Sequence, residues 1–198
     1  TMRLGGGIGY DFSTLRPSGD TIRSLDSNSS GPVSFMTIFD AMCGTISSSG
    51  HRRGAQMGIL RVDHPDIRAF ITAKQNVWNL TNFNISVAVT DDFMRAVKQD
   101  LPFDLKFEGK VYDTVSARDL WDEIMESTWD WAEPGIIFID RINKKNNLWY
   151  CETISATNPC AEQPLPPFGA CLLGSVNLTK YVKQTPQGAF YFDYNLFA

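Results

Sequence analysis

The chain has 198 residues, of which 43% are hydrophobic and 12% aromatic, and its formal net charge is −4. This length and apolar content allow one domain with a buried core and argue against intrinsic disorder. The acidic balance lacks the basic footprint of a nucleic-acid-binding protein. No apolar run reaches membrane-spanning length, and no secretory signal opens the chain. We therefore expect a cytoplasmic protein that binds neither nucleic acid nor a membrane.

Cysteine and histidine usage gives little support to a disulfide framework or a metal site. The four cysteines include no CxxC pair, and the two histidines are thirteen residues apart. Cys43 and Cys151 are therefore expected to be small buried hydrophobic residues. We expect no bound metal.

The first third of the chain moves from loop to helix to strand. Residues 1–31 read as a glycine-rich loop followed by polar turns. From Pro32 to near Ile46 apolar residues recur at helical spacing, which predicts an amphipathic helix. The residues expected on its buried face are Phe35, Ile38, Phe39 and Met42. After a polar loop, residues 57–62 read as a strand, and residues 64–74 read as a helix with proline in its first turn.

The pattern of alternating strands and helices continues to residue 140. Residues 83–89 alternate as in a strand, and residues 91–100 form a short helix that begins with two acids. Residues 101–115 read as a hairpin with FEGKV at its turn, and residues 136–140 read as a short apolar strand. Such alternation predicts an α/β fold with largely parallel strand pairing.

A longer helix is predicted between the hairpin and the last strand. Ser116 and Asp119 resemble a capping box, which places the start of this helix near residue 117. The helix continues through Trp129, and Pro134-Gly135 ends it. Its predicted apolar stripe is Leu120, Trp121, Ile124, Met125 and Thr128. We expect the Met and Trp residues on the helices to lie in the core.

Two glycine-bounded segments are candidates for contact with an anion. GGGIG (Gly5–Gly9) resembles a phosphate-cradling loop, because bare backbone N–H groups can approach an anion closely. It matches neither a Walker A loop nor a dinucleotide fingerprint. Arg52 and Arg53 in SSSGHRRGAQ suit a phosphate or a base edge, and Arg16 in LRPSGD is a further candidate. Solvent-exposed loops without a ligand are the alternative.

The stretch ATNPCAEQPLPPFGAC (residues 156–171) carries the strongest chemical signal. Its prolines exclude a helix and favour extended geometry, in which alternate residues point the same way. Asn158, Cys160 and Glu162 are therefore expected to share one face. A carboxylate beside a thiol disfavours the thiolate that a nucleophile needs. The thiol then suits hydrogen-atom transfer, and the carboxylate is free to act as general acid or base on a substrate hydroxyl.

Several motifs carry a resemblance to a known family. NPCAEQPL and GACLLGSVNL resemble the finger-loop region of the ribonucleotide reductase large chain, most of all its adenosylcobalamin-dependent (class II) subtype. GGGIGYDFSTLRPSGD, GPVSFMTIFDA, GHRRGAQMGILRVDHPDI and NFNISV are similar to other family segments in the same order. This resemblance implies roughly the first half of a ten-stranded α/β barrel with the finger loop inside it. Residues 1–198 would form a single partial catalytic barrel domain, truncated at both ends.

The resemblance also implies catalytic roles for four residues. Cys160 would become the transient thiyl radical that abstracts the ribose 3′-hydrogen, Glu162 would deprotonate the 3′-hydroxyl, and Asn158 would hydrogen-bond the ribose. Cys171 would be one of two redox-active cysteines that form a disulfide, and its partner is expected upstream of the glycines. Ala161 departs from the glycine that is more frequent in this subtype, and we expect the change to be tolerated.

Substrate, effector and cofactor assignments follow from the same resemblance. It implies adenosylcobalamin, a dithiol reductant such as thioredoxin, a ribonucleoside di- or triphosphate substrate and a deoxynucleoside triphosphate effector. The remaining part of the reductase and a second copy of the chain, in a homodimer, are the expected protein partners. Gly6, Gly7 and Arg52 would bind the substrate. Arg16, Ser49 and Gly50 would bind the effector or relay its identity.

Three alternatives stay open from the sequence. The chain could belong to the class I large subunit, which takes its radical from a diiron protein. It could be a nucleotide-binding or assembly module that is catalytically silent alone. A cysteine hydrolase is a third reading, and Glu162 so near Cys160 argues against it because it disfavours a thiolate.

Overall fold

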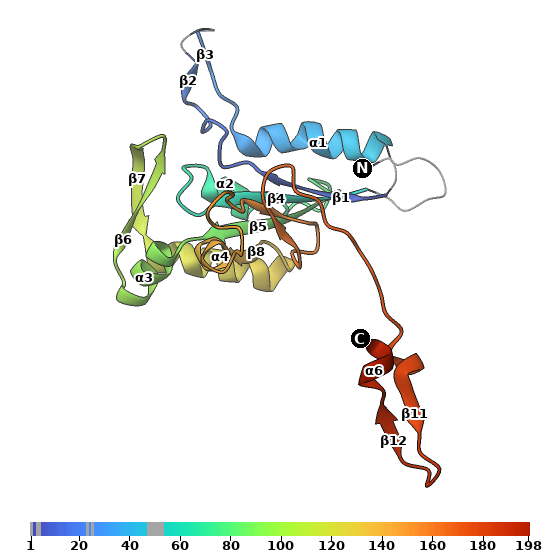
Figure 1. Ribbon diagram of the computed structural model, residues 1–198. Coiled ribbons are helices and arrows are strands. Elements are labelled where there is room, and N and C mark those ends of the chain that lie inside the picture. The colour runs from blue at the N-terminus through green and yellow to red at the C-terminus, as the bar shows by residue number, and fades with distance from the viewer. Residues whose placement is uncertain (1, 3–4, 23, 25, 47–53) are drawn as a thin grey trace.

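The computed structural model describes residues 2, 5–22, 24, 26–46 and 54–198 (Figure 1). The strands are β1 (Gly7–Asp11), β2 (Thr21–Ile22), β3 (Ser27–Asn28), β4 (Ala55–Arg61), β5 (Phe83–Val89), β6 (Pro102–Phe107), β7 (Lys110–Ser116), β8 (Gly135–Phe138), β9 (Ala156–Thr157), β10 (Pro164–Leu165), β11 (Val182–Gln184) and β12 (Phe190–Phe192). The helices are α1 (Pro32–Ile46), α2 (Ile67–Ile71), α3 (Asp91–Gln99), α4 (Ala117–Trp131), α5 (Ile139–Lys144), α6 (Tyr194–Phe197) and the 3₁₀ helix η2 (Leu178–Tyr181).

A four-stranded parallel sheet in the order β1-β4-β5-β8 forms the centre of the protein. Its strands follow one another in chain order, so each connection returns the chain to the next position in the sheet. The predicted α/β class with parallel pairing is confirmed. The four strands form an open sheet within the described part of the chain.

The two faces of the sheet are covered by different elements. Alternate side chains of β4 and β5, such as Leu60 and Val87, join the larger core with α1, α2, α3 and α4. The residues between them, such as Ile59 and Ala88, form a smaller cluster. Ile139 and Ile142 of α5 and Ala156 of β9 pack against this cluster. We call the side that bears the smaller cluster the inner face.

Local sequence signals placed most elements correctly. The predicted helices correspond to α1, α3 and α4, and Ser116 caps α4 by accepting a hydrogen bond from the Asp119 backbone N–H at 3.1 Å. The predicted hairpin is β6–β7, and Glu108 and Gly109 at its tip both have positive φ (49° and 80°). Two such residues in succession match the twist of antiparallel strands. The helix expected over residues 64–74 is shorter, because only Ile67–Ile71 is α-helical.

The prediction of loop and turns for residues 1–31 was wrong at Gly7–Asp11. This segment is the strand β1, which pairs in parallel with β4. Tyr10 and Phe12 pack on the larger core, while Gly7 and Gly9 occupy alternate positions on the other side. Glycines on one side hide the strand pattern, since they contribute neither β propensity nor apolar periodicity.

The buried face predicted for α1 was also wrong in part. Met36 and Cys43 are buried, whereas Phe35 and Ile38 are 41% and 61% exposed. Apolar residues surround much of this helix, so their spacing does not define one face, and the position of the sheet selects the buried one.

Three expected core residues lie at the surface. Trp129 and Trp131 of α4 are 89% and 44% exposed, whereas Leu120, Ile124 and Ser127 are its buried residues in this region. Cys151 is also exposed, and its thiol contacts the Leu148 carbonyl oxygen at 3.5 Å within a loop. Cys43 is buried, as predicted.

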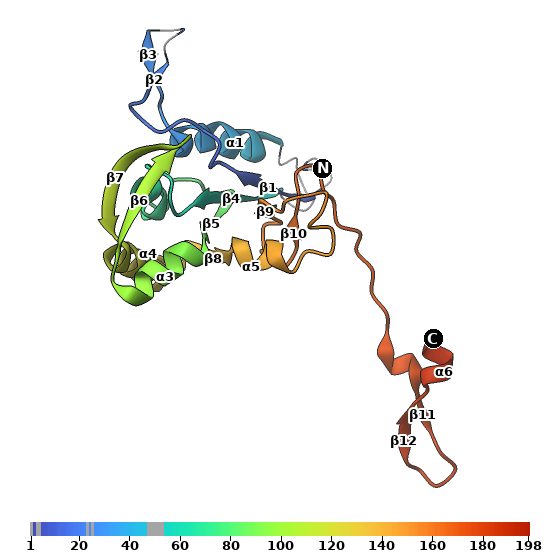
Figure 2. The same ribbon diagram turned by 60° about the vertical axis from the view of Figure 1, so that its left-hand side comes forward.

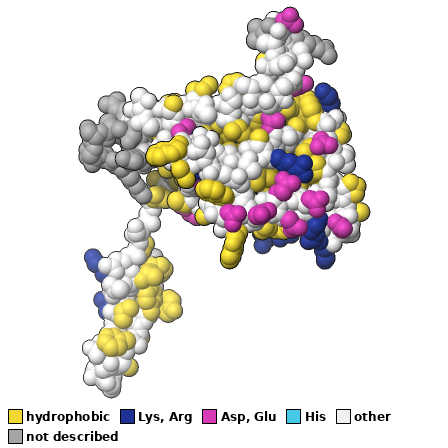
Figure 3. Space-filling view, turned by 180° about the vertical axis from the view of Figure 1, so that it is seen from behind, with side chains coloured by type: hydrophobic (Ala, Val, Ile, Leu, Met, Phe, Trp, Pro, Cys, Tyr) yellow, Lys and Arg dark blue, Asp and Glu magenta, His cyan; other side chains and the backbone are white. Residues whose placement is uncertain are grey.

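Residues 171–198 form an arm that extends away from the sheet (Figures 1 and 2). The arm holds η2, β11, β12 and α6, and its own aromatic cluster contains Tyr181, Phe192 and Phe197. Hydrophobic side chains gather on its surface (Figure 3), among them Leu172 and Phe190, which are 100% and 73% exposed. The arm therefore has too few internal contacts to bury its apolar residues.

Candidate functional site

The stretch singled out from the sequence forms a short hairpin. β9 and β10 pair antiparallel, with Thr157 opposite Pro164 and Ala156 opposite Leu165. The residues between these strands close on themselves, because the Ala161 backbone N–H donates to the Asn158 carbonyl oxygen at 3.0 Å. The Asn158 N–H also donates to the Gln163 carbonyl oxygen at 3.2 Å, and the Asn158 side-chain oxygen accepts from the Gln163 N–H at 3.0 Å. We call residues 156–165 the site hairpin.

The expected extended alternation of Asn158, Cys160 and Glu162 was wrong. The chain turns at Pro159 and Cys160, and Ala161 has the left-handed φ of 67°. Proline does exclude a helix here, but it is also compatible with the first positions of a turn. The three residues therefore lie within a tight hairpin tip instead of along one face of a strand. Cys160 and Glu162 are exposed there, and Asn158 is half-buried.

The glycines of β1 provide the surface on which the site hairpin rests. A Cβ atom at Gly9 would lie 1.8 Å from the Thr157 carbonyl oxygen, and one at Gly7 would lie 2.5 Å from the Pro159 ring. No side chain fits into these distances, so glycine is required for the hairpin to approach this closely. Contact with the hairpin is a role of Gly7 that the sequence did not predict.

Asn84 of β5 also contacts the site hairpin. Its side-chain Nδ2 donates a hydrogen bond to the Pro159 carbonyl oxygen at 2.7 Å. Gly9 lies opposite Met57 in the sheet, and Met57 lies opposite Asn84, so all three occupy one row on the inner face. The site hairpin therefore spans the row from β1 to β5.

Another anchor lies just upstream of the site hairpin. Asn143 of α5 donates through Nδ2 to the Ile154 carbonyl oxygen at 2.9 Å and accepts from the Ile154 N–H at 2.8 Å. This pair of bonds fixes the chain two residues before β9. Asparagine side chains can thus replace the missing strand partner of an irregular segment.

A pocket of about 840 Å³ opens between the site hairpin, β8 and α5. Thr157, Ala161 and Pro164 form its hairpin side. Its charged lining groups are both cationic, Arg141 and Lys145. Arg141 is also within ion-pair distance of Asp91, at 3.3 Å, and its guanidinium lies 4.9 Å from the centre of the Phe138 ring. The pocket suits a group with an apolar face and an anionic or hydrogen-bonding edge.

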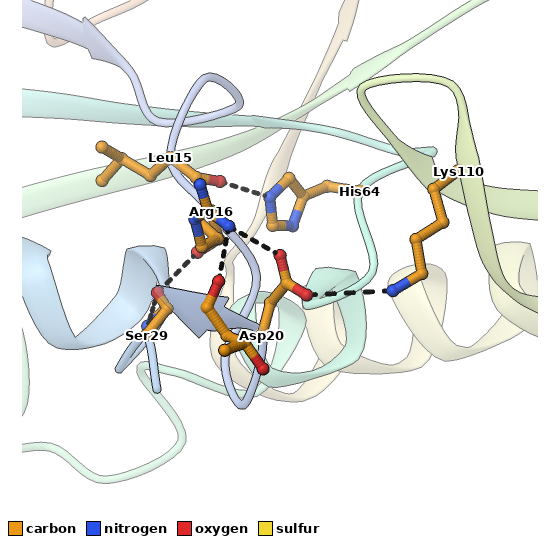
Figure 4. A network of polar contacts seen from close by, with 8 residues as sticks. Leu15, Arg16, Asp20, Ser29, His64 and Lys110 are labelled. Carbon is orange, nitrogen blue, oxygen red and sulfur yellow. Dashed lines mark hydrogen bonds and ion pairs between the residues drawn. The ribbon is translucent and has the colours of Figure 1, made fainter. Parts of the chain in front are cut away.

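Arg16 is the one candidate for an anion contact among the arginines singled out above that lies within the described residues. It belongs to a polar network with partners from several segments (Figure 4). Its Nη1 donates to the Thr21 carbonyl oxygen at 2.8 Å and to Asp20 at 3.3 Å, and Lys110 approaches the same carboxylate at 3.8 Å. Desolvation acts to raise the pKa of Asp20, but a hydrogen bond from Tyr112 and the charges of Lys110 and Arg16 outweigh it and lower that pKa. An anion that binds Arg16 would compete with Asp20.

A buried histidine fixes the loop that carries Arg16. His64 is 2% exposed, and its Nδ1 accepts from the Asp66 backbone N–H at 3.1 Å. Because Nδ1 is the acceptor, Nε2 carries the hydrogen and donates to the Leu15 carbonyl oxygen at 3.0 Å. His64 therefore has a structural role, and it ties the residue before Arg16 to the turn after β4 (Figure 4).

The remaining predicted site residues are not brought together by the described structure. Cys171 is exposed at the start of the arm, and its thiol is free, as are the other three. Gly6 precedes β1 and is half-buried. Arg52, Ser49 and Gly50 lie outside the described residues.

The described residues contain neither a metal-binding cluster nor a membrane-spanning helix. No group of three or more His, Cys, Asp and Glu side chains there has an arrangement that could hold a metal ion. None of the helices there combines the length and hydropathy that crossing a bilayer requires.

The whole chain is similar to proteins of one known family. A family model described as "Ribonucleotide reductase, barrel domain" matches residues 1–198. A vitamin B12-dependent ribonucleoside-diphosphate reductase of Thermoplasma acidophilum is 49% identical over 183 residues, which are 91% of this chain and 24% of the relative. The Mycobacterium tuberculosis protein with the same description is 45% identical over 182 residues, or 90% of this chain and 26% of the relative.

A more distant relative gives the same picture. The vitamin B12-dependent ribonucleotide reductase of Streptomyces coelicolor is 36% identical over 220 residues, which cover 98% of this chain and 23% of the relative. The chain thus spans about a quarter of the length of the curated relatives that it matches.

Proposed function

The chain belongs to the ribonucleotide reductase barrel-domain family, and we propose that it carries the reactive thiol of such an enzyme as part of a longer protein. The reaction is the reduction of a ribonucleotide to a 2′-deoxyribonucleotide by thiyl-radical chemistry. The observation that supports the proposal most directly is the exposed thiol of Cys160 at the tip of a hairpin that packs closely on the sheet and is hydrogen-bonded to it. A hydrogen-atom carrier needs both access and a fixed position.

The residues of the site hairpin divide the chemistry between them. Cys160 loses a hydrogen atom from sulfur, and the resulting thiyl radical takes the hydrogen atom from ribose C3′. Glu162, also exposed at the tip, accepts the proton of the 3′-hydroxyl. Asn158 uses its side-chain oxygen within the hairpin, so its Nδ2 group is the part that donates to the ribose.

The reduction needs two electrons and two protons, which a pair of thiols supplies as it forms a disulfide. In our proposal Cys171 is one of these thiols, and the C2′ oxygen leaves as water. The second thiol would come from another segment of the enzyme. An external dithiol such as thioredoxin then reduces the disulfide.

Adenosylcobalamin is the proposed radical source, because the relatives described above are named as vitamin B12-dependent. The exposed thiol fits this assignment, since a large cofactor can reach it only from outside the hairpin. When bound, the cofactor would supply the radical that removes the hydrogen atom from sulfur. The chain's own part is to hold the thiol of Cys160 at the hairpin tip.

Regulation and assembly complete the proposal. Arg16 would bind the triphosphate of a deoxynucleoside effector in exchange for Asp20, and Ser49 and Gly50 would belong to the loop that relays effector identity. Gly6, Gly7 and Arg52 would lie near the substrate, a ribonucleoside di- or triphosphate.

The open sheet would continue into a ten-stranded barrel with the site hairpin as its finger loop, and the whole chain would be one part of that catalytic domain. The enzyme would work in the cytoplasm, and a homodimer is the expected assembly.

The substitution Cys160→Ser in the complete reductase tests the proposal. A serine hydroxyl does not give up its hydrogen atom to a radical as a thiol does, so turnover should be abolished. Effector affinity, measured by calorimetry with a deoxynucleoside triphosphate, should stay within twofold of the unsubstituted enzyme. Retained turnover would remove Cys160 from the reaction and with it the proposed function.

A further inference from the structure

The position of the reactive thiol depends on one peptide bond, the one that joins Pro159 to Cys160. The carbonyl oxygen of this peptide accepts the hydrogen bond from Asn84 Nδ2 at 2.7 Å. The nitrogen of the same planar group belongs to Cys160. A group that fixes the carbonyl therefore also fixes the nitrogen and Cα of the cysteine. The turn bond from the Ala161 N–H to the Asn158 carbonyl oxygen spans Cys160, and together the two bonds restrict the direction in which its Cα–Cβ bond leaves the chain.

The contacts of the hairpin strands alone do not supply this restraint. β9 and β10 pair through only two residues each, and the tip between them contains the left-handed Ala161. Pro159 has no N–H to donate, so its carbonyl is the backbone hydrogen-bonding group that it can offer. Gly7 allows the Pro159 ring to approach the sheet, but this is a contact without direction. The hydrogen bond from Asn84 adds a direction.

Asn84 is also suited to the role by its own support. It lies on β5 between Phe83 and Ile85, which are buried in the larger core at 1% exposure each. Its backbone is paired with β4, where it lies opposite Met57. Its side chain is therefore presented from one of the most firmly packed strands of the sheet, on the inner face and toward the site hairpin.

We infer that Asn84 is a positioning residue for the thiol of Cys160, acting through the Pro159 carbonyl. This inference rests on the proposed function, since it assigns the position of Cys160 a consequence for turnover. Asn84 touches no reacting atom in this scheme. Its effect is to keep the hairpin tip in the one orientation from which sulfur can exchange a hydrogen atom with the ribose.

The test uses three variants of the complete reductase. Asn84→Asp keeps the shape of the side chain but presents an oxygen to the carbonyl, and Asn84→Ala removes the contact. Asn82→Ala is the matched control, because Asn82 Nδ2 donates to the Asp40 carbonyl oxygen at 3.1 Å, away from the site hairpin. Thermal unfolding shows whether each variant folds, and steady-state kinetics give kcat and KM separately.

Both Asn84 variants should lower kcat by about tenfold to a hundredfold, the range expected when a reacting group is misplaced by about 1 Å. KM for the ribonucleotide should change less than twofold, and Asn82→Ala should retain the kcat of the unsubstituted enzyme. Alkylation of Cys160 by iodoacetamide, followed by peptide mass spectrometry in the cofactor-free enzyme, should become faster in the Asn84 variants only.

Two results would overturn the inference. One is an unchanged kcat and an unchanged Cys160 alkylation rate in a folded Asn84→Ala enzyme. The other is an equal loss of kcat in Asn84→Ala and Asn82→Ala, which would mark a general loss of stability. Failure of the proposed function has a different signature. Cys160→Ser would then retain turnover, while the alkylation rates would still show whether Asn84 holds the hairpin.

Discussion

The close approach of the site hairpin to β1 predicts a large effect for the smallest substitution, Gly9→Ala. The added Cβ would lie 1.8 Å from the Thr157 carbonyl oxygen and 2.9 Å from the carbonyl carbon. Carbon and oxygen atoms in contact are about 3.3 Å apart, so the hairpin must move by about 1.5 Å. The backbone of Gly9 is held in the sheet by its pairing with Met57, so the displacement falls on the hairpin, in which Thr157 is paired with Pro164.

The magnitude follows from two opposing contributions. Overpacking of this kind costs about 1–3 kcal/mol. Alanine restricts the unfolded chain more than glycine does, which offsets about 0.5 kcal/mol of that cost. We expect the free energy of unfolding to fall by about 0.5–2.5 kcal/mol, measured by urea denaturation of the chain with tryptophan fluorescence. In the complete reductase, kcat should fall further than this loss of stability explains, because the hairpin that carries Cys160 is displaced.

Gly174→Ala is the matched control. No atom lies within 4 Å of the position that its Cβ would occupy, and its φ is not in the left-handed region. This variant should keep both the free energy of unfolding and kcat. The reasoning would be refuted if Gly9→Ala also kept both, since the hairpin would then not be held against β1 in solution.

Two further predictions concern a proposed catalytic group and a buried thiol. Glu162→Gln should lower kcat at least tenfold without a change in the thermal midpoint, because Glu162 is exposed and a glutamine cannot accept the 3′-hydroxyl proton; an unaltered kcat would remove its assigned role. Burial raises the pKa of the Cys43 thiol, and Asp40 adds to the shift. The folded state therefore binds the thiol proton more tightly than the unfolded chain does. The contribution of Cys43 to the free energy of unfolding is complete below the ordinary thiol pKa of 9.0 and is lost as pH rises above it. Urea denaturation between pH 8 and pH 11 should show this decline, and Cys43→Val should reduce its slope; equal slopes would contradict the assignment.

Local signals in the sequence were sufficient for the elements whose stability depends on neighbouring residues. The cap of α4 at Ser116 and the turn of the β6–β7 hairpin at Glu108 and Gly109 were readable because they require particular residues within a few positions. The α/β class followed from the alternation of such elements. The family resemblance was also visible in the sequence, since it rests on long motifs in a fixed order.

Contacts between distant segments were not readable in the same way. No local pattern connects Asn84 with Pro159, which are 75 positions apart, or Gly9 with Thr157. The NFNISV motif contained the signal for Asn84, a polar residue at an inner position of an apolar strand, but its partner depends on where the hairpin crosses the sheet. The role of Asn143 could not be predicted either, because it depends on a hydrogen bond to Ile154, which is outside its helix.

The sequence by itself determined the chemical content of this protein: a thiol, a carboxylate and an amide close together in a proline-rich segment, within an α/β pattern. It did not determine their geometry. Proline restricts its own φ and the residue before it, but it permits both an extended strand and a turn. Tertiary contacts select the turn. The glycines on β1 let the hairpin approach the sheet, and Asn84 donates a hydrogen bond to the carbonyl next to Cys160. The position of the thiol is therefore a property of the sheet beneath it.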